Sequence, residues 1–300
     1  MIHVEQITKS FEGVTAVHNL DLAVKKGSIY GLLGSNGAGK TTLLKMMAGI
    51  YRQNSGQIHI EGQPIYENVS LKQKVVFIPD SLYFLPQATI RQMADYYRSF
   101  YPEWDDKRFE ALGKVFSIDP KRKIQRLSKG MQRQVSFWLA FSCKPMVMIL
   151  DEPVDGLDPV MRQKVKNLLF QEVAERELTV IVSSHNLREI EDICDHIGIM
   201  HKGQLLIEKE LDDLKTDTHK IQVAFAAKND EQDLLEQLEV MHHEKRGSVS
   251  LMIVKGAKKE VAKTITAKHP LVFDILPLTL EEMFIYEMGG AGYEIENVLL

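Results

Sequence analysis

One stretch of the chain has the residue types and the spacing of a phosphate-binding loop, G-x-x-x-x-G-K-[ST]: Gly34, Ser35, Asn36, Gly37, Ala38, Gly39, Lys40 and Thr41. Glycines let successive backbone N–H groups turn toward an anion, and the positive end of a following helix adds to the attraction. Lys40 supplies a cation for terminal phosphates, the Thr41 hydroxyl suits Mg²⁺, and Thr42 is a further expected contact. The alternative is a glycine-rich turn that binds nothing, and the Lys and Thr argue against it.

Two adjacent carboxylates, Asp151 and Glu152, follow the apolar run Val147–Leu150. An Asp at the tip of a strand beside a phosphate-binding loop commonly holds Mg²⁺. Glu152 is then placed to accept a proton from an attacking water, the usual task of a carboxylate base. Such a pair alone is weak evidence, because carboxylates often cap the next element. With the glycine-rich loop upstream, it predicts a nucleoside triphosphatase site.

Short apolar runs indicate the elements that must position these side chains. The runs at Ile29–Leu33, Val75–Ile78 and Thr179–Val182, like that at Val147–Leu150, suit buried parallel strands, each followed by helical spacing. Alternation near the N-terminus and over Ala16–Val24 favours half-buried strands. The sequence therefore predicts an α/β fold with a parallel sheet.

The stretch Leu127-Ser128-Lys129-Gly130-Met131-Gln132-Arg133 distinguishes between classes of nucleotide-binding protein. Ser-x-Gly opening a helix is by itself a capping device. Here it lies about twenty residues before the Asp-Glu strand, and that arrangement resembles the signature of the ABC transporter ATPases, Leu-Ser-Gly-Gly-Gln. Over about the first 210 residues, other motifs match too. Phe11 resembles the aromatic that stacks on adenine, Gly156-Leu157-Asp158-Pro159 the D-loop, and His185 the switch histidine that contacts the γ-phosphate.

The resemblance implies a P-loop NTPase with a mixed sheet core, an antiparallel β subdomain and a helical subdomain at about 82–142. It further implies Mg²⁺-dependent ATP hydrolysis, with Glu152 and His185 as catalytic residues and Thr41 and Asp151 at the metal. Two nucleotide-binding subunits, identical or different, would dimerise head to tail, with Ser128 and Gly130 of one closing over ATP on the other. A separate transmembrane permease would be driven by that cycle, with the chain peripheral on the cytoplasmic face of the membrane.

The chain departs from the family's pattern at three positions. Asp80, after Val75–Ile78, stands where the family has a Gln that touches Mg²⁺, so the expected metal set becomes Thr41, Asp80 and Asp151. Carboxylates suit Mg²⁺, although Asp80, Asp151 and Glu152 would repel one another and the ATP phosphates in one small site. An Asp80 that faces solvent remains the alternative. Lys129 and Met131 depart from the signature.

An aromatic-rich stretch follows: Tyr83, Phe84, Tyr96, Tyr97, Phe100, Tyr101 and Trp104. The helical spacing of Tyr97, Phe100 and Tyr101 favours a buried face. In the family this subdomain cradles a short coupling helix of the permease, so exposed members would serve as interface anchors. Core packing and docking both remain open for each residue.

A composition shift near Leu211 predicts a boundary between an ATPase domain at 1–210 and a small α+β extension at 211–300. This tail has 10 Lys+Arg and 16 Asp+Glu, a net charge of −6. Strand-like Lys220–Phe225 and Ser248–Val254 flank helical-looking Glu231–Leu238, and His242-His243 are interpreted as solvated surface. The stretch Ala88–Asp105 and the ending Leu278–Phe284 resemble bacterial exporter ATPases for drugs, antibiotics or lipids.

Composition excludes some classes of function. The net charge of −4 gives no basic field for nucleic acid, and no run of about 18 apolar residues suits a bilayer-spanning helix. Cys143 and Cys194 lie in apolar stretches and are expected to be buried and unpaired. Two rivals stay open: an ABC ATPase acting on ribosomes or DNA, which generally needs two cassettes, and a regulatory member that binds ATP without hydrolysing it. Glu152 and His185 argue against the second.

Overall fold

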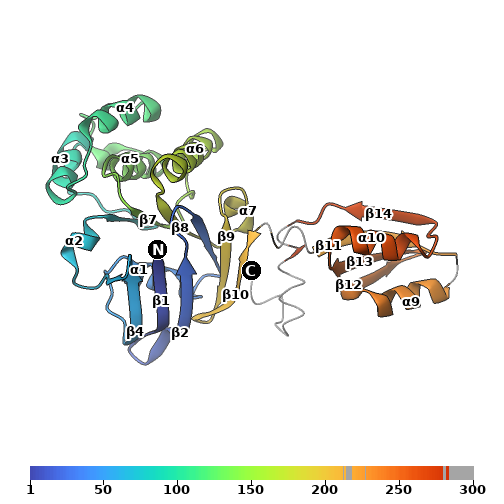
Figure 1. Cartoon of the computed structure of the whole chain (residues 1–300). Coiled ribbons are helices and arrows are strands. Elements are labelled where there is room, and N and C mark those ends of the chain that lie inside the picture. Colours follow the sequence, from blue (N-terminus) through green and yellow to red (C-terminus); the bar gives the residue numbers. More distant parts are fainter. Residues whose placement is uncertain (212, 214–217, 227, 280–281, 284–300) are drawn as a thin grey trace. The chain divides into compact units, whose positions relative to one another are not determined.

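The computed structural model describes all residues except 212, 214–217, 227, 280–281 and 284–300. The chain divides into two compact units, Met1–Glu208 and Lys209–Leu300. Both units are drawn in Figure 1. Within the described part of the chain, no helix is both long and apolar enough to cross a membrane.

The first unit contains an antiparallel sheet with the strand order β2-β1-β4-β5. Its strands are β1 (Ile2–Phe11), β2 (Val14–Val24), β4 (Ser55–Ile60) and β5 (Gln63–Pro64). Ile2, Val4 and Ile7 of β1 are buried while His3 and Glu5 are exposed. This is the alternation expected of a strand that covers a core with one face only.

A six-stranded sheet with the order β10-β9-β3-β8-β7-β6 forms the centre of the same unit. The strands are β3 (Ile29–Leu33), β6 (Val75–Ile78), β7 (Val147–Asp151), β8 (Thr179–Ser184), β9 (His196–His201) and β10 (Gln204–Glu210). Strands β6, β7, β8, β3 and β9 pair in parallel, so their carboxyl ends lie along one edge of the sheet. The predicted α/β fold is confirmed, and Asp151 and Ser183, at the ends of β7 and β8, are register partners.

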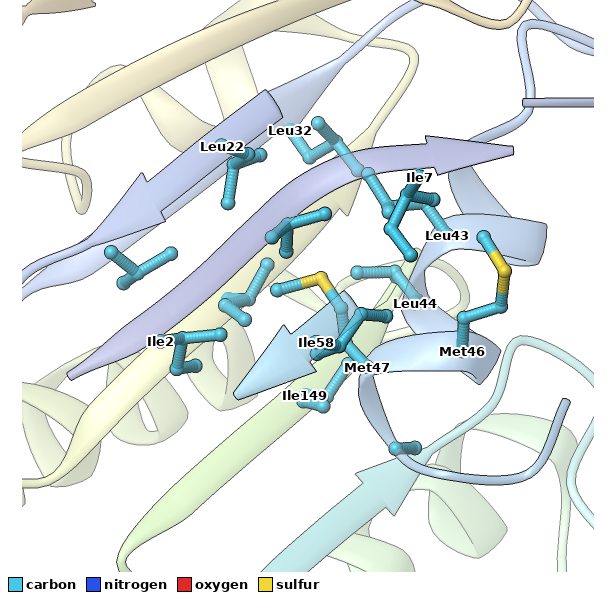
Figure 2. Close-up of a cluster of buried hydrophobic side chains, with 14 of the residues drawn as sticks. Ile2, Ile7, Leu22, Leu32, Leu43, Leu44, Met46, Met47, Ile58 and Ile149 are labelled. Atoms are coloured by element: carbon cyan, nitrogen blue, oxygen red, sulfur yellow. The ribbon is translucent and has the colours of Figure 1, made fainter. Parts of the chain in front are cut away.

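Side chains from both sheets and from α1 (Lys40–Met47) share one core (Figure 2). Ile2 and Ile58 from the antiparallel sheet, Leu43 and Met47 from α1, and Ile149 from β7 are all essentially inaccessible to solvent. Burying an aliphatic side chain contributes about 1.5–3 kcal/mol. The helix that follows the glycine-rich loop is therefore fixed on a packed base.

Three helices gather into the predicted helical subdomain: α3 (Ile90–Phe100), α4 (Asp106–Phe116) and α5 (Lys129–Ser142) (Figure 1). Trp138 stacks on Phe109 with 4.6 Å between ring centroids and joins α5 to α4. Buried Glu172 of α6 (Pro159–Arg176) pairs with Arg108 of α4 and Arg176. This ion cluster connects α4 of the helical subdomain to α6.

The aromatic stretch does not form a continuous buried face. Helix α3 buries Ile90, Met93 and Ala94, whereas Phe100 is 51% exposed. Of the two alternatives left open for Phe100, core packing is therefore excluded. Tyr97 and Tyr101 are half-buried and stack on each other at 5.6 Å. Cys143 and Cys194 are buried and free, and burial raises the pKa of both thiols.

Among its described residues, the second unit contains a four-stranded antiparallel sheet ordered β12-β13-β11-β14, together with helices α9 and α10. Along the chain its elements are β11 (Thr218–Ala224), α9 (Lys228–Gln237), β12 (Glu239–Arg246), β13 (Val249–Lys255), α10 (Lys258–Thr266) and β14 (Val272–Leu276). This β-α-β-β-α-β order is the split βαβ, or ferredoxin-like, arrangement. His243 is an exposed residue of β12 and lies 3.2 Å from Glu231 of α9, whereas His242 is half-buried. Part of Leu278–Phe284 lies outside the described residues.

Candidate active site

The glycine-rich loop connects β3 to α1, and two of its glycines have no room for a side chain. A Cβ on Gly34 would collide with the carbonyl oxygen of Met200, and one on Gly39 with that of Ala16. Gly39 also has φ 104°, a left-handed conformation that favours glycine. The predicted loop therefore has the strand–turn–helix context that its motif requires.

Lys40 is the first residue of α1, and its side chain is buried. Its ammonium donates to the carbonyl oxygens of Gly34 at 2.5 Å and Ser35 at 3.3 Å. It also lies 3.6 Å from Oε1 of Glu152. Burial lowers the pKa of Lys40, and the carboxylates of Glu152 and Asp151 offset part of that effect. A buried cation inside a loop that can bind anions is suited to phosphate oxygens.

Asp151 connects α1, the helix after this loop, to strand β8. The Thr41 hydroxyl donates to Oδ2 of Asp151 at 2.8 Å, and the Ser183 hydroxyl donates to Oδ1 at 2.7 Å. Asp151 is only 1% exposed. Its carboxylate is therefore held by two hydroxyls, one from α1 and one from β8.

Glu152 follows directly and takes an unusual backbone conformation, with φ 47°. A glutamate in this region is uncommon, and such conformations cluster at functional sites. Its backbone N–H donates to the Ser183 hydroxyl at 3.2 Å, and its Oε2 lies 2.9 Å from Nδ1 of His185. Burial raises the pKa of Glu152, while Lys40 and His185 oppose this shift. The carboxyl is thus a stronger base than an ordinary glutamate.

A cavity of about 370 Å³ opens over these groups. Its lining consists of Ala16, Ser35, Asn36, Gly37, Ala38, Gly39, Lys40, Thr41, Thr42, Asp80 and Glu152. Asp80 therefore reaches the same cavity as the glycine-rich loop, although 57% of its side chain is exposed. Thr41, Asp80 and Asp151 offer the hard oxygen donors that Mg²⁺ prefers, so these residues fit that ion.

Six predicted residues are not part of this lining. Three of them contact it: the Gly34 carbonyl accepts from Lys40, Asp151 accepts from Thr41, and His185 contacts Glu152. The other three are Phe11, Ser128 and Gly130. Phe11 ends β1, is 40% exposed and packs edge-on against Tyr51 at 5.5 Å. Ser128 caps α5, where its hydroxyl oxygen accepts from the Met131 N–H at 3.2 Å. Gly130 lies against the carbonyl oxygen of Gly156, where a Cβ would be only 2.5 Å from that oxygen.

Sequence reasoning missed Ser183 and Arg133. Ser183 bonds both Asp151 and Glu152, and a signal existed because polar Ser183 and Ser184 end an otherwise apolar strand. Arg133, 5% exposed, donates to the carbonyl oxygens of Pro79 and Asp80, both at 2.8 Å. A cation within the apolar face of α5 was the available signal.

A buried strand (β3), a glycine-rich loop, a helix opening with Lys-Thr and an Asp at the end of β7, separated from β3 by β8, together define a P-loop nucleoside triphosphatase. The family profile described as ABC transporter matches residues 17–155. The chain is 33% identical to the ABC transporter ATP-binding protein YtrB of Bacillus subtilis, over 97% of this chain and 99% of YtrB. It is 30% identical to the bacitracin transport ATP-binding protein BcrA of Bacillus licheniformis, over 97% and 98%.

Solved structures agree with this assignment of the fold. The structure of an ATP-binding subunit of an ABC transporter matches 72% of this chain and 92% of its own, with a TM-score of 0.67 and 24% identity. The dimeric cassette MJ0796 matches 70% of this chain and 99% of its own, with a TM-score of 0.65 and 21% identity. The chain belongs to the ABC transporter ATP-binding proteins. It is an ATPase cassette in which ATP hydrolysis is coupled to transport.

Proposed function

We propose that this chain is the ATP-hydrolysing subunit of an exporter, driving a separately encoded permease from the cytoplasmic face of the membrane. The observation that carries the proposal is the grouping of Lys40, Thr41, Asp80 and Glu152 around one cavity, with Asp151 bonded beneath it. Retention of both Glu152 and His185, in contact at 2.9 Å, favours hydrolysis over regulatory binding alone.

Each residue then has a role in the reaction. The loop N–H groups and Lys40 bind the phosphates of ATP. Bound Mg²⁺, held by Thr41, Asp151 and Asp80, would neutralise charge on the terminal phosphates. Glu152 accepts a proton as the water oxygen bonds to the γ-phosphorus, and the bond to the ADP oxygen breaks, releasing ADP and phosphate. His185 orients the Glu152 carboxylate and lies beside the γ-phosphate.

A second copy, or a similar subunit, would complete each ATP site. Ser128 and Gly130 do not line the cavity of their own chain, as head-to-tail pairing requires. The Ser128 hydroxyl and the start of α5 would face the γ-phosphate held by the partner. The stronger affinity of ATP for the closed dimer drives the cycle.

The permease contact is assigned to an aromatic groove between α2 (Val69–Lys72) and α3. This cavity of about 380 Å³ is lined by Val69, Lys72, Gln73, Tyr96, Tyr97, Phe100 and Tyr101. Tyr96 is 45% exposed and packs on Phe100 at 4.8 Å. Exposed paired aromatics are typical interface anchors, so the groove suits a short amphipathic helix.

Export is the direction favoured by the relatives' names. BcrA is described by bacitracin transport, and a linearmycin resistance ATP-binding protein of Bacillus subtilis, LnrL, is 34% identical over 69% of this chain. Resistance is readily explained by removal of the antibiotic from the cell.

Affinity purification from detergent-solubilised membranes tests the proposal. We expect a multi-span membrane protein to co-purify, and Phe100→Ala to reduce its recovery because an anchor of the groove is lost. Phe170→Ala is the matched control, since Phe170 of α6 is an aromatic of similar exposure, at 41%, and does not line the groove. Recovery of ribosomes or DNA in place of a membrane protein would reject the assignment.

A further inference from the structure

Another cavity shares Asp80 with the cavity over the nucleotide loop. It has a volume of about 420 Å³ and is lined by Asp80, Ser81, Leu82, Lys129, Gln132, Arg133, Asp155 and Gly156. These residues come from three segments: the turn after β6, the first two turns of α5, and the turn after Glu152. Asp80 lines both cavities, so it forms part of the wall between them.

Two backbone contacts hold the start of α5 at this cavity. Arg133 donates to the carbonyl oxygens of Pro79 and Asp80, and its Nη2 lies 3.4 Å from the Asp80 carboxylate. Gly130, in the first turn of α5, packs so closely on the Gly156 carbonyl that a Cβ would not fit without movement. The helix start is therefore fixed between two loops of the catalytic site.

The charges of the lining balance. Asp80 and Asp155 are two acids, and Lys129 and Arg133 are two bases, giving a formal sum of zero. Arg133 is already paired with Asp80. Lys129 directly precedes Gly130, and Asp155 directly precedes Gly156. Because these two glycines are in contact, Lys129 and Asp155 come to the lining of the same cavity. Of the two cations in the lining, Lys129 is thus the one that is not paired with Asp80.

We propose that Lys129 is a positioning residue that pairs across this cavity with Asp155 and so sets the position of its neighbour, Ser128. The inference rests on the proposed function, because Ser128 acts on ATP held by the partner. Asp155 also lies beside the catalytic pair: ligand atoms of Glu152, Asp155 and His185 all fall within 4.8 Å of one another. The Lys129–Asp155 pair therefore links α5, which completes the ATP site of the partner subunit, to Glu152, the base in the site of its own chain.

The test is a double-mutant cycle on the full chain with Lys129→Met, Asp155→Asn and the double variant, measuring kcat and KM for ATP. Lys129→Met leaves Asp155 unbalanced and should lower kcat about tenfold with little change in KM, since Lys40 and Thr41 still bind the phosphates. Adding Asp155→Asn restores neutrality, so the double variant should recover about threefold or more relative to additive effects. Lys129→Arg should keep the parental kcat within about twofold.

The exposed Lys121→Met is the control, because Lys121 does not line the cavity. The inference would be overturned if the effects of Lys129→Met and Asp155→Asn were additive, or if Lys129→Met had the same kcat as Lys121→Met. ATP hydrolysis by the parental chain would still leave the proposed function standing in that case. A parental chain without ATPase activity would instead reject the proposed function, and the inference with it.

Discussion

The ammonium of Lys40 lies 3.6 Å from the carboxylate of Glu152, so the phosphate-binding cation and the proposed base contact each other. Burial lowers the pKa of Lys40 and raises that of Glu152, and each partner opposes the shift of the other. Phosphate oxygens compete with Glu152 for Lys40. ATP binding would thus free the base at the moment when its substrate arrives.

Replacing Lys40 tests the binding half of this exchange. Lys40→Ala removes a charge-assisted contact, which costs about 1.5–3 kcal/mol, so the Kd for ATP should rise about tenfold to a hundredfold. Isothermal calorimetry measures the change. Lys45→Ala, in the same helix but outside the cavity, should leave the Kd close to parental. Unchanged affinity for Lys40→Ala contradicts the assignment.

The raised pKa of Glu152 predicts how hydrolysis depends on pH. The base must be ionised, so activity falls as the pH drops through its pKa. Since burial raises this pKa above the ordinary 4.5, the acid limb of kcat should lie above pH 4.5. When the phosphates of ATP bind Lys40, Glu152 loses a cation that lowers its pKa, so the pKa of Glu152 rises further. A pH–rate profile that stays flat down to pH 4.5 would show that this carboxyl does not limit catalysis.

Asp80 should make ATP binding more dependent on metal. Its carboxylate lines the same cavity as Glu152, and like charges there repel the phosphates unless Mg²⁺ is bound. Asp80→Gln should therefore improve ATP affinity without Mg²⁺ more than with it. Affinities are compared by titration in Mg²⁺ and in a chelator. If both affinities change equally, or neither changes, Asp80 is not at the metal.

Composite sites predict complementation between two inactive chains. In a dimer of Ser128→Arg with Lys40→Ala, both lesions fall in one site and the other site stays intact. Mixtures should therefore hydrolyse ATP faster than either variant alone, with a maximum near equal amounts. No gain at any ratio would mean that Ser128 does not act on the partner's nucleotide, or that one site cannot work alone.

The central part of the fold was accessible from sequence because parallel strands are buried on both faces. The run Ile29–Leu33 is β3, and Val147–Leu150 is β7 without its last residue, Asp151. Carboxyl ends of parallel strands share one edge, and there Thr41, Asp151 and Ser183 meet. Motif spacing and strand topology together thus determine most of the cavity.

Other features could not be predicted, for identifiable physical reasons. Helical spacing shows which residues share a face but not what covers it, and Phe100 is 51% exposed. Strand β12 has polar or half-buried residues on both faces, so Glu239–Arg246 carries no clear alternation. Arg133 bonds residues 54 and 53 positions away, a contact that no local pattern reveals.

Mg²⁺-dependent ATP hydrolysis by Glu152→Gln tests the central claim most directly. Gln keeps the size of the side chain but cannot accept the proton, so turnover should fall about 10²- to 10⁴-fold while ATP remains bound. Glu175→Gln, an exposed position of α6 away from the cavity, should hydrolyse ATP at the parental rate. Parental turnover by Glu152→Gln would contradict the account, because the chemistry would then not use this carboxylate.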